Sequence, residues 1–183
     1  MATQQQGPTP EFAVAYRDVM LMGLENEMKA TQRVLAAVPD ANRDYKPDPN
    51  ARTAWELAWH LASADVQMLE DIADRKFAMD ARFKEEPKTS AELATWYEQN
   101  FPRAIERVRA MSAEELLTPV DFYGVFTLPD VFYLGFVNNH SIHHRGALAT
   151  YLRPMGAKCP SIYGGSYDEP FIPPTAASEE TAA

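Results

Sequence analysis

The sequence predicts an all-α fold, a four-helix bundle with a short irregular or strand-like segment before the last helix. Four long segments carry apolar residues at the three- and four-residue spacing of a helix face. The stretches between them are rich in Pro, Asp, Asn or charged residues, which favour turns and loops. Neither an internal repeat nor a linker divides the chain of 183 residues, so these helices are expected to share one hydrophobic core.

The first two helices are expected over residues 11–38 and from Thr53 to about residue 75. The segment between them, PDANRDYKPDPN at 39–50, is too dense in Pro, Asp and Asn to continue a helix. Thr53 is followed three residues later by Glu56, the pattern of a capping box in which each side chain bonds the other residue's backbone N–H. This pair therefore predicts where the second helix begins.

The third helix is expected to start at Ser90 and to include SAELATWYEQNFPRAIERVRAM. Pro102 lies inside this segment and is expected to kink or divide the helix, because proline lacks the N–H that an inner turn needs. A short helical turn is predicted over 112–117, with Ser112 as its cap.

The segment 118–127 is the one stretch with strand-forming composition, since it is rich in Val, Phe and Tyr. Its short length and Gly124 leave two alternatives open, a strand or an extended loop. The residues TLPD at 127–130 then predict the start of the fourth helix, which is expected to run to about residue 153. Pro154 follows directly and favours that end.

We expect a flexible tail over residues 1–10, the bundle over 11–165, and a second tail over 166–183. The net charge of −9 argues against a nucleic-acid partner, which would need an excess of Lys and Arg on one face. No apolar run has the roughly 18 residues that span a membrane, and the N-terminus does not resemble a signal peptide. With Cys159 as its single cysteine, the chain is expected to be cytoplasmic.

Three of the four histidines lie close together in NNHSIHHRGAL. On a helix, His140 and His144 project about 40° apart, toward the apolar face, whereas His143 diverges by about 60° from His140. A pair at positions i and i+4 can offer two imidazole nitrogens to one metal ion. The same pair can also be two hydrogen-bonded core histidines, and the motif alone favours neither interpretation.

The fourth histidine, His60, lies in WELAWHLASAD on the polar stripe of the second helix. Periodicity favours a solvated histidine on the wet face of an amphipathic helix. The wide apolar arc of this helix gives weaker support to the alternative, in which the polar stripe lines a cavity.

Three segments in order, YKPDP, WELAWHL and HSIHHRGALATYLRPMG, resemble the DinB-like (DinB/YfiT) superfamily of small four-helix proteins over residues 11–163. The resemblance implies an up-down-down-up bundle in which a divalent metal, zinc or nickel, is bound by His60, His140 and His144. It also implies a homodimer and, from some relatives, thiol-dependent S-transfer with a low-molecular-weight thiol such as bacillithiol or mycothiol. Many members of the superfamily have Gln at the position of Ala147. This chain lacks that polar side chain, so a role of the Gln does not carry over to it.

The leading hypothesis is a metal-dependent enzyme that transfers a thiol or a related group to a small organic substrate. The alternatives are a non-catalytic metal-binding or dimerising module and a plain helical scaffold with incidental histidines. Because Cys159 lies beyond the last helix, the thiol is expected to come from a cosubstrate. Arg145 is expected in a buried ion pair that braces the bundle, with anion binding as the second interpretation. The candidates for residues around the metal or along a pocket are His143, Glu56, Ser63, Tyr133 and Tyr151.

Overall fold

The computed structural model describes residues 7–79 and 82–173. Most of the expected N-terminal tail, residues 1–6, and the end of the expected C-terminal tail, 174–183, lie outside the described residues. Within the described part, the segment after residue 165 contacts the bundle. Asp168 accepts a hydrogen bond from Arg153 at 3.0 Å, and Glu169 pairs with Arg33.

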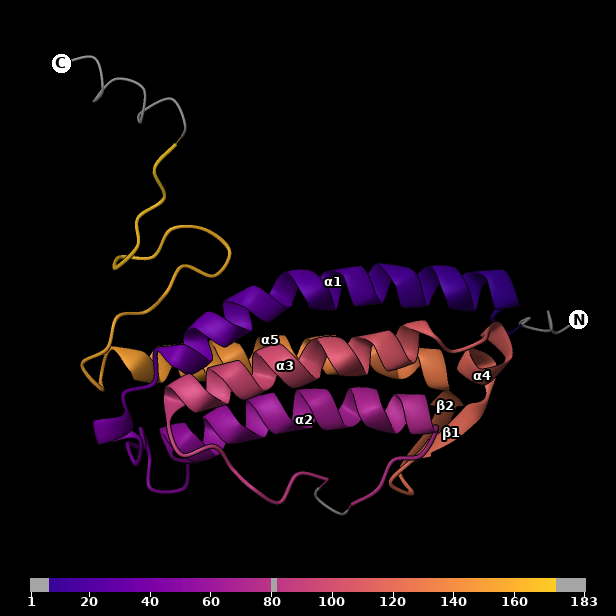
Figure 1. Ribbon diagram of the computed structural model, residues 1–183, viewed down its shortest axis with the longest axis horizontal. Coiled ribbons are helices and arrows are strands. Elements are labelled where there is room, and N and C mark those ends of the chain that lie inside the picture. The colour runs from indigo at the N-terminus through magenta and orange to yellow at the C-terminus, as the bar shows by residue number, and fades with distance from the viewer. Residues whose placement is uncertain (1–6, 80–81, 174–183) are drawn as a thin grey trace, which may run out of the picture.

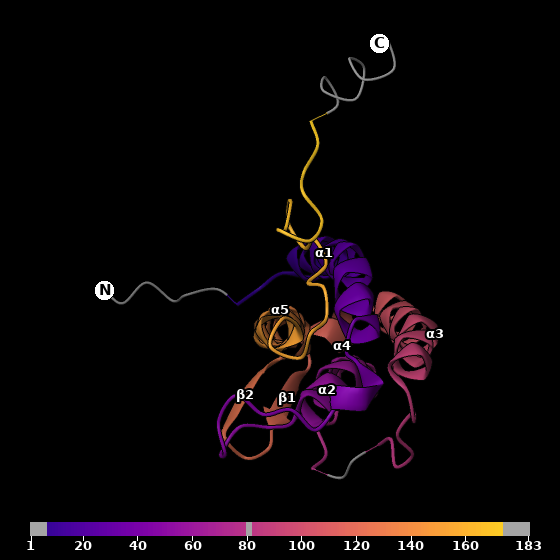
Figure 2. The ribbon, with the colours of Figure 1, turned by 90° about the vertical axis from the view of Figure 1, so that its left-hand side faces the viewer.

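Four long helices form the bundle, and they pack in a ring (Figures 1 and 2). They are α1 (Pro10–Ala36), α2 (Ala54–Asp74), α3 (Ser90–Arg109) and α5 (Tyr133–Leu152). Helix α1 packs on α3 and α5, and α2 packs on the same two helices. Figure 1 shows α1 and α5 running one way and α2 and α3 running the other. The predicted four-helix, up-down-down-up bundle is therefore confirmed.

Side chains at the helix starts explain why the chain becomes helical where it does. Thr53 accepts a hydrogen bond from the backbone N–H of Glu56, whose carboxylate accepts one from the N–H of Thr53, so the predicted capping box is present. Ser112 and Glu115 form the same box at the short helix α4 (Ala113–Leu117). Such caps satisfy backbone donors that have no partner inside the helix.

Helix α3 passes through Pro102 as one element, so the proline does not divide it. The helix is held from two sides by α1 and α2. Phe101, Ala104 and Ile105 around the proline are all buried. Burial of these residues offsets the hydrogen bond that the proline removes, which costs an unsupported helix about 3 kcal/mol.

The segment whose strand or loop structure was left open forms a hairpin of β1 (Pro119–Phe122) and β2 (Phe126–Pro129). Thr127 pairs with Asp121 in this ladder, so the prediction that the fourth helix begins at Thr127–Asp130 is wrong. A short 3-10 turn (Asp130–Phe132) follows, and α5 begins at Tyr133. Pairing with β1 outweighed the local helix-start signal, because each ladder bond satisfies a backbone group that a fraying helix end leaves free.

The apolar core lies along the bundle axis and includes residues of all four long helices. Two of the largest fully buried side chains, Arg145 and Tyr97, carry polar groups. None of the helices in the described ranges is long and apolar enough to cross a membrane.

Candidate metal centre

Three histidines converge between α2 and α5. His60 projects from α2, and its Nε2 lies 3.2 Å from Nε2 of His140 and 3.2 Å from Nε2 of His144, both on α5. Each of the three can offer one nitrogen such that all three nitrogens lie within 4.8 Å of one another. All three side chains are half-buried, so the cluster is reached from the surface rather than sealed in the core.

This arrangement decides between the alternatives left open for His60. His60 faces the neighbouring helix α5 and the two histidines there, so it is not a freely solvated surface residue. The predicted pairing of His140 and His144 on one helix face is also present, with ring centroids 4.4 Å apart.

A buried carboxylate orients one of the three rings. Oδ1 of Asp65, one turn beyond His60 on α2, lies 2.8 Å from Nδ1 of His140. Its other oxygen accepts a hydrogen bond from the hydroxyl of Tyr97 on α3, at 3.2 Å. Asp65 and Tyr97 are both 0% exposed. Burial raises the pKa of Asp65, and hydrogen bonds from His140 and Tyr97 oppose that rise.

Asp65 was not among the residues predicted for the site, although its position in the sequence is unusual for an acidic residue. Asp65 lies four residues from both Leu61 and Leu69, so the helix period places it on the apolar stripe of α2. An acidic side chain at such a position needs a partner, because an unpaired buried carboxylate is costly. Tyr97 on α3 could not be linked to this position by spacing, since it comes from another helix.

The two contacts of His60 Nε2 cannot both be full hydrogen bonds if His140 carries its proton on Nδ1, because one imidazole nitrogen carries at most one proton. Nδ1 of His140 faces a carboxylate, so we assign the proton of that ring to Nδ1, which leaves its Nε2 as a bare lone pair. Burial lowers the pKa of His60 to about 4, with the charges of Arg52 and His140 acting in the same direction. Burial lowers the pKa of His144 to about 3, and the neighbouring histidines act in the same direction. Near neutral pH, His60 and His144 are therefore uncharged and can act as ligands.

These residues fit a divalent metal. Zinc bonds histidine nitrogen at about 2.0–2.1 Å, so two such ligands at a tetrahedral angle lie about 3.3 Å apart. The two 3.2 Å separations from His60 Nε2 are close to that value. The Asp65–His140 contact is also the carboxylate–histidine pairing that orients a metal-binding ring. A cation would therefore satisfy lone pairs that the described protein atoms leave facing one another.

Two candidates for groups around the metal have other partners. Glu56 is exposed, and its carboxylate bonds the backbone N–H of Thr53 at 2.7 Å. The Ser63 hydroxyl donates to the carbonyl of Trp59 at 2.7 Å. Neither of these contacts involves the three histidines, and each is a local bond between a side chain and the backbone of the same helix or its cap.

His143 is exposed, and its ring centroid lies 4.8 Å from that of His144. It therefore lies at the rim of the cluster, outside the converging three.

Tyr133 and Tyr151, the two tyrosines expected along a pocket, differ in burial and in their partners. Tyr133 is 1% exposed, and its hydroxyl donates to the carbonyl of Val120 at 2.7 Å and accepts from the N–H of Leu128. It fixes the hairpin to α5, so the expectation that it rims a pocket is corrected. Tyr151 is half-buried and meets Tyr45 edge to face at 5.7 Å, so it lies beside the loop that precedes α2.

Arg145 follows His144 in the chain but points to the other side of α5. It is 1% exposed and pairs with Glu27 of α1 at 2.5 Å. It also donates to the Thr31 hydroxyl at 3.3 Å and to the Tyr163 hydroxyl. The predicted buried ion pair that braces the bundle is present.

Comparison with known proteins adds the family. A model of the DinB superfamily matches residues 24–148, a range that contains all three converging histidines. The chain belongs to the DinB superfamily.

Other known proteins are similar to this chain at low identity. The DinB chain is 26% identical over 153 residues to the uncharacterized protein YrdA of Bacillus subtilis strain 168, covering 83% of this chain and 90% of that protein. A crystal structure of a DinB-like protein from Bacillus cereus ATCC 10987 matches with a TM-score of 0.66 at 25% identity, covering 79% of this chain and 95% of that one. The DinB-like protein YjoA of Bacillus subtilis matches with a TM-score of 0.66 at 19% identity, covering 78% and 96%.

Proposed function

We propose that this DinB protein binds a divalent metal, zinc or nickel, through His60, His140 and His144, and that it catalyses transfer of a thiol or a related group to a small organic substrate. The observation that carries the proposal is the convergence of three imidazole nitrogens, with Nε2 of His60 lying 3.2 Å from Nε2 of both His140 and His144. Three protein ligands leave a coordination position for substrate, as in catalytic rather than structural zinc sites.

The residues of the chain have distinct parts in this proposal. A bound metal would act as a Lewis acid that lowers the pKa of a thiol or water. Asp65 holds the His140 ring with its Nε2 turned toward His60, and Tyr97 holds Asp65. Cys159 lies after α5 with its thiol toward the carbonyl of Pro160 at 3.7 Å, so the reacting thiol would be a low-molecular-weight cosubstrate.

A second candidate function is a metal-binding module without catalysis, in which the metal holds the fold together. The supporting observation is that the ligands come from two neighbouring helices, His60 from α2 and the pair from α5, so a metal would cross-link them. Metal binding would then contribute directly to folding stability. The homodimer implied by the family resemblance is also proposed, and light scattering of the purified chain tests it.

Metal analysis of untagged protein tests the proposal, with His60→Ala and His143→Ala as a matched pair. His60→Ala is expected to lower the metal content and to weaken metal binding by at least about 100-fold, because it removes a ligand. His143→Ala removes the rim histidine and should change neither. Wild-type protein with no metal above background and no binding in titrations would refute the proposed function.

The melting temperatures of the same variants separate the two candidate functions. If the metal only supports catalysis, His60→Ala should keep a melting temperature close to that of the wild type. If the metal holds the bundle together, the variant should melt well below the metal-loaded wild type. A thiol-consumption screen with several cosubstrate thiols then tests for S-transfer.

A further inference from the structure

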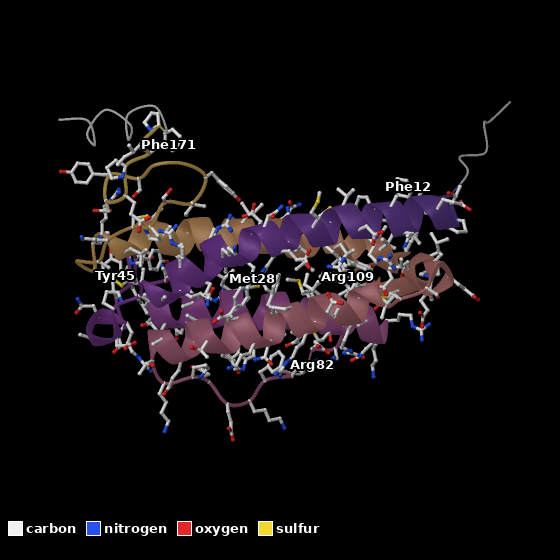
Figure 3. All side chains as sticks on the ribbon, turned by 45° about the horizontal axis from the view of Figure 1, so that its top comes forward. Phe12, Met28, Tyr45, Arg82, Arg109 and Phe171 are labelled. Atoms are coloured by element: carbon white, nitrogen blue, oxygen red, sulfur yellow. The ribbon has the colours of Figure 1, made fainter. Side chains whose placement is uncertain are left out.

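A layer of five buried polar side chains crosses the core of the bundle behind the histidines. Every long helix contributes to this polar layer, which consists of Thr31 of α1, Asp65 of α2, Tyr97 of α3, and Ser141 and Arg145 of α5. None of the five is more than 1% exposed. Figure 3 shows Met28, three residues before Thr31 and on the same face of α1, in the middle of the bundle. Polar groups buried at this depth are costly unless they bond one another.

On the side away from the histidines, a row of polar contacts runs from Arg145 to Ser141. Nη1 of Arg145 donates to the Thr31 hydroxyl at 3.3 Å, and the oxygen of that hydroxyl makes a long contact of 3.5 Å with the hydroxyl oxygen of Ser141. A guanidinium has only donors, so the Thr31 oxygen accepts from Arg145 and its proton points elsewhere. That proton is available to Ser141, whose own proton is then left for a further acceptor.

The further acceptor is the carboxylate of Asp65. Ser141 directly follows His140 in α5, and Nδ1 of His140 lies 2.8 Å from Oδ1 of Asp65. Burial raises the pKa of Asp65, and hydrogen bonds from Ser141 and Tyr97 are among the causes that oppose this rise. Burial and the charge of Asp65 raise the pKa of Tyr97, and hydrogen bonds with Ser141 and Thr31 oppose that rise. The two hydroxyls therefore lie against the pair formed by Asp65 and Tyr97.

The polar layer thus joins a buried cation to a buried carboxylate. Arg145 can only donate hydrogen bonds and the carboxylate of Asp65 can only accept them, so the hydroxyl protons between them are ordered in one direction. Hydrogen bonds in such a row strengthen one another in the dry core. The carboxylate that faces the His140 ring is held from α3 and from α5, and its partner on α5 is held in turn from α1.

We propose that Thr31 and Ser141 are positioning residues of the histidine cluster, which act on the His140 ring through Asp65, with Arg145 as the fixed end of the row. Among the described contacts, neither hydroxyl bonds an imidazole nitrogen, so both act at one remove from the ring. The proposal rests on the function proposed above only in treating the three histidines as a metal site, because the state of the His140 ring can be followed without metal.

Calorimetric titration with zinc compares variants that remove or keep one hydroxyl. Thr31→Val keeps the shape of the side chain but removes its hydroxyl, and it should weaken zinc binding about three- to tenfold, less than the loss of a group that bonds the ring directly. Ser141→Ala should weaken zinc binding to a similar extent. Thr31→Ser restores the hydroxyl and should bind zinc as tightly as the wild type. Thr95→Val makes the same change at an exposed threonine of α3, whose hydroxyl bonds the carbonyl of Ala91, and should have no effect.

A double-mutant cycle with Asp65→Asn separates a positioning role from a general loss of stability. If Thr31 acts through Asp65, Thr31→Val should weaken zinc binding in the wild type but should leave it unchanged in protein that already carries Asp65→Asn. Equal losses of affinity in the two backgrounds would show that the polar layer only holds the helices together, and would overturn the proposal.

Nuclear magnetic resonance of the metal-free protein gives a readout that a loss of stability alone does not move. Nitrogen-15 spectra of the histidine rings at neutral pH show which ring nitrogen carries the proton. In the wild type and in Thr95→Val, His140 should carry its proton on Nδ1, facing Asp65. In Thr31→Val and Ser141→Ala, part of the His140 population should carry it on Nε2 instead, because the carboxylate is no longer held against Nδ1.

The outcomes separate this proposal from the proposed function. Zinc binding by the wild type that neither Thr31→Val nor Ser141→Ala weakens, with an unchanged His140 ring, would overturn the positioning role and leave the metal site intact. A protein that binds no zinc, but whose His140 ring responds to both variants and not to Thr95→Val, would support the positioning role and refute the metal function.

Discussion

Buried and half-buried polar side chains are partnered differently on the two sides of α5. On one side, Arg145 is surrounded by partners from α1 and from the C-terminal segment, and its charge is neutralised by Glu27. On the other side, His140 and His144 each place Nε2 at 3.2 Å from Nε2 of His60. A polar group that only holds the bundle together is compensated by the protein itself. The three histidine nitrogens that face one another are the ones for which we propose a ligand from outside the chain.

Removal of the ion pair made by Arg145 is expected to have the largest effect on stability. Arg145→Met should lower the free energy of unfolding by roughly 3 kcal/mol, because it leaves Glu27 and Thr31 without their buried partner. Urea denaturation of metal-free protein measures this change. Arg103→Met, at an exposed position, should stay within about 0.5 kcal/mol of the wild type. If Arg145→Met lowered the free energy of unfolding by less than about 1 kcal/mol, the view that this side of α5 holds the bundle together would be contradicted.

Loss of the carboxylate behind the histidines should affect metal binding more than stability. Asp65→Asn keeps the size of the side chain but removes the charge that orients His140, so metal affinity should fall by about 10- to 100-fold. Calorimetric titration with zinc measures the affinity. Asp71→Asn is a matched control, because Asp71 is also buried on α2 but pairs with Arg82. Equal affinities in the two variants would show that Asp65 has only a structural role.

A third buried polar group is Asp130, which follows β2. Its side-chain oxygens are buried without a hydrogen-bond partner among the described residues, and burial raises its pKa to about 8. This value lies above the ordinary pKa of about 4 for an unfolded chain. The stability that protonated Asp130 contributes is therefore present below about pH 4 and is lost as the pH rises through 8.

Asp130→Asn should consequently be more stable than the wild type at pH 8 to 9, by about 1–2 kcal/mol, because no charge has to be buried. The difference should shrink as the pH falls toward 4. Melting temperatures across this range measure it, with Asp44→Asn, in an exposed loop, as the control. A difference that does not change with pH would place the carboxyl of Asp130 in contact with water.

The parts of the fold that depend on neighbours in the chain were predicted well. The capping box at Thr53 and the cap at Ser112 were found where expected, because their bonds span three residues. The shared face of His140 and His144 followed from the helix period in the same way. The start of α5 was misplaced because Thr127 is held by Asp121 of another strand, and that pairing outweighed the local signal.

The site itself needed information that spacing does not contain. Periodicity favoured a solvated His60, and only the family resemblance placed it with the pair on α5. Asp65 was recognisable as an acidic residue on an apolar stripe, but its partners His140 and Tyr97 lie 75 and 32 residues away.

The sequence by itself determined the four helices, most of their ends and which side chains share a face, because these depend on interactions within one or two turns. The packing of α2 against α5 decided that three histidines converge, and the packing of α3 decided that Asp65 is held behind them. Those contacts form between residues far apart in the chain, and they are selected by burial of the whole core rather than by any local preference.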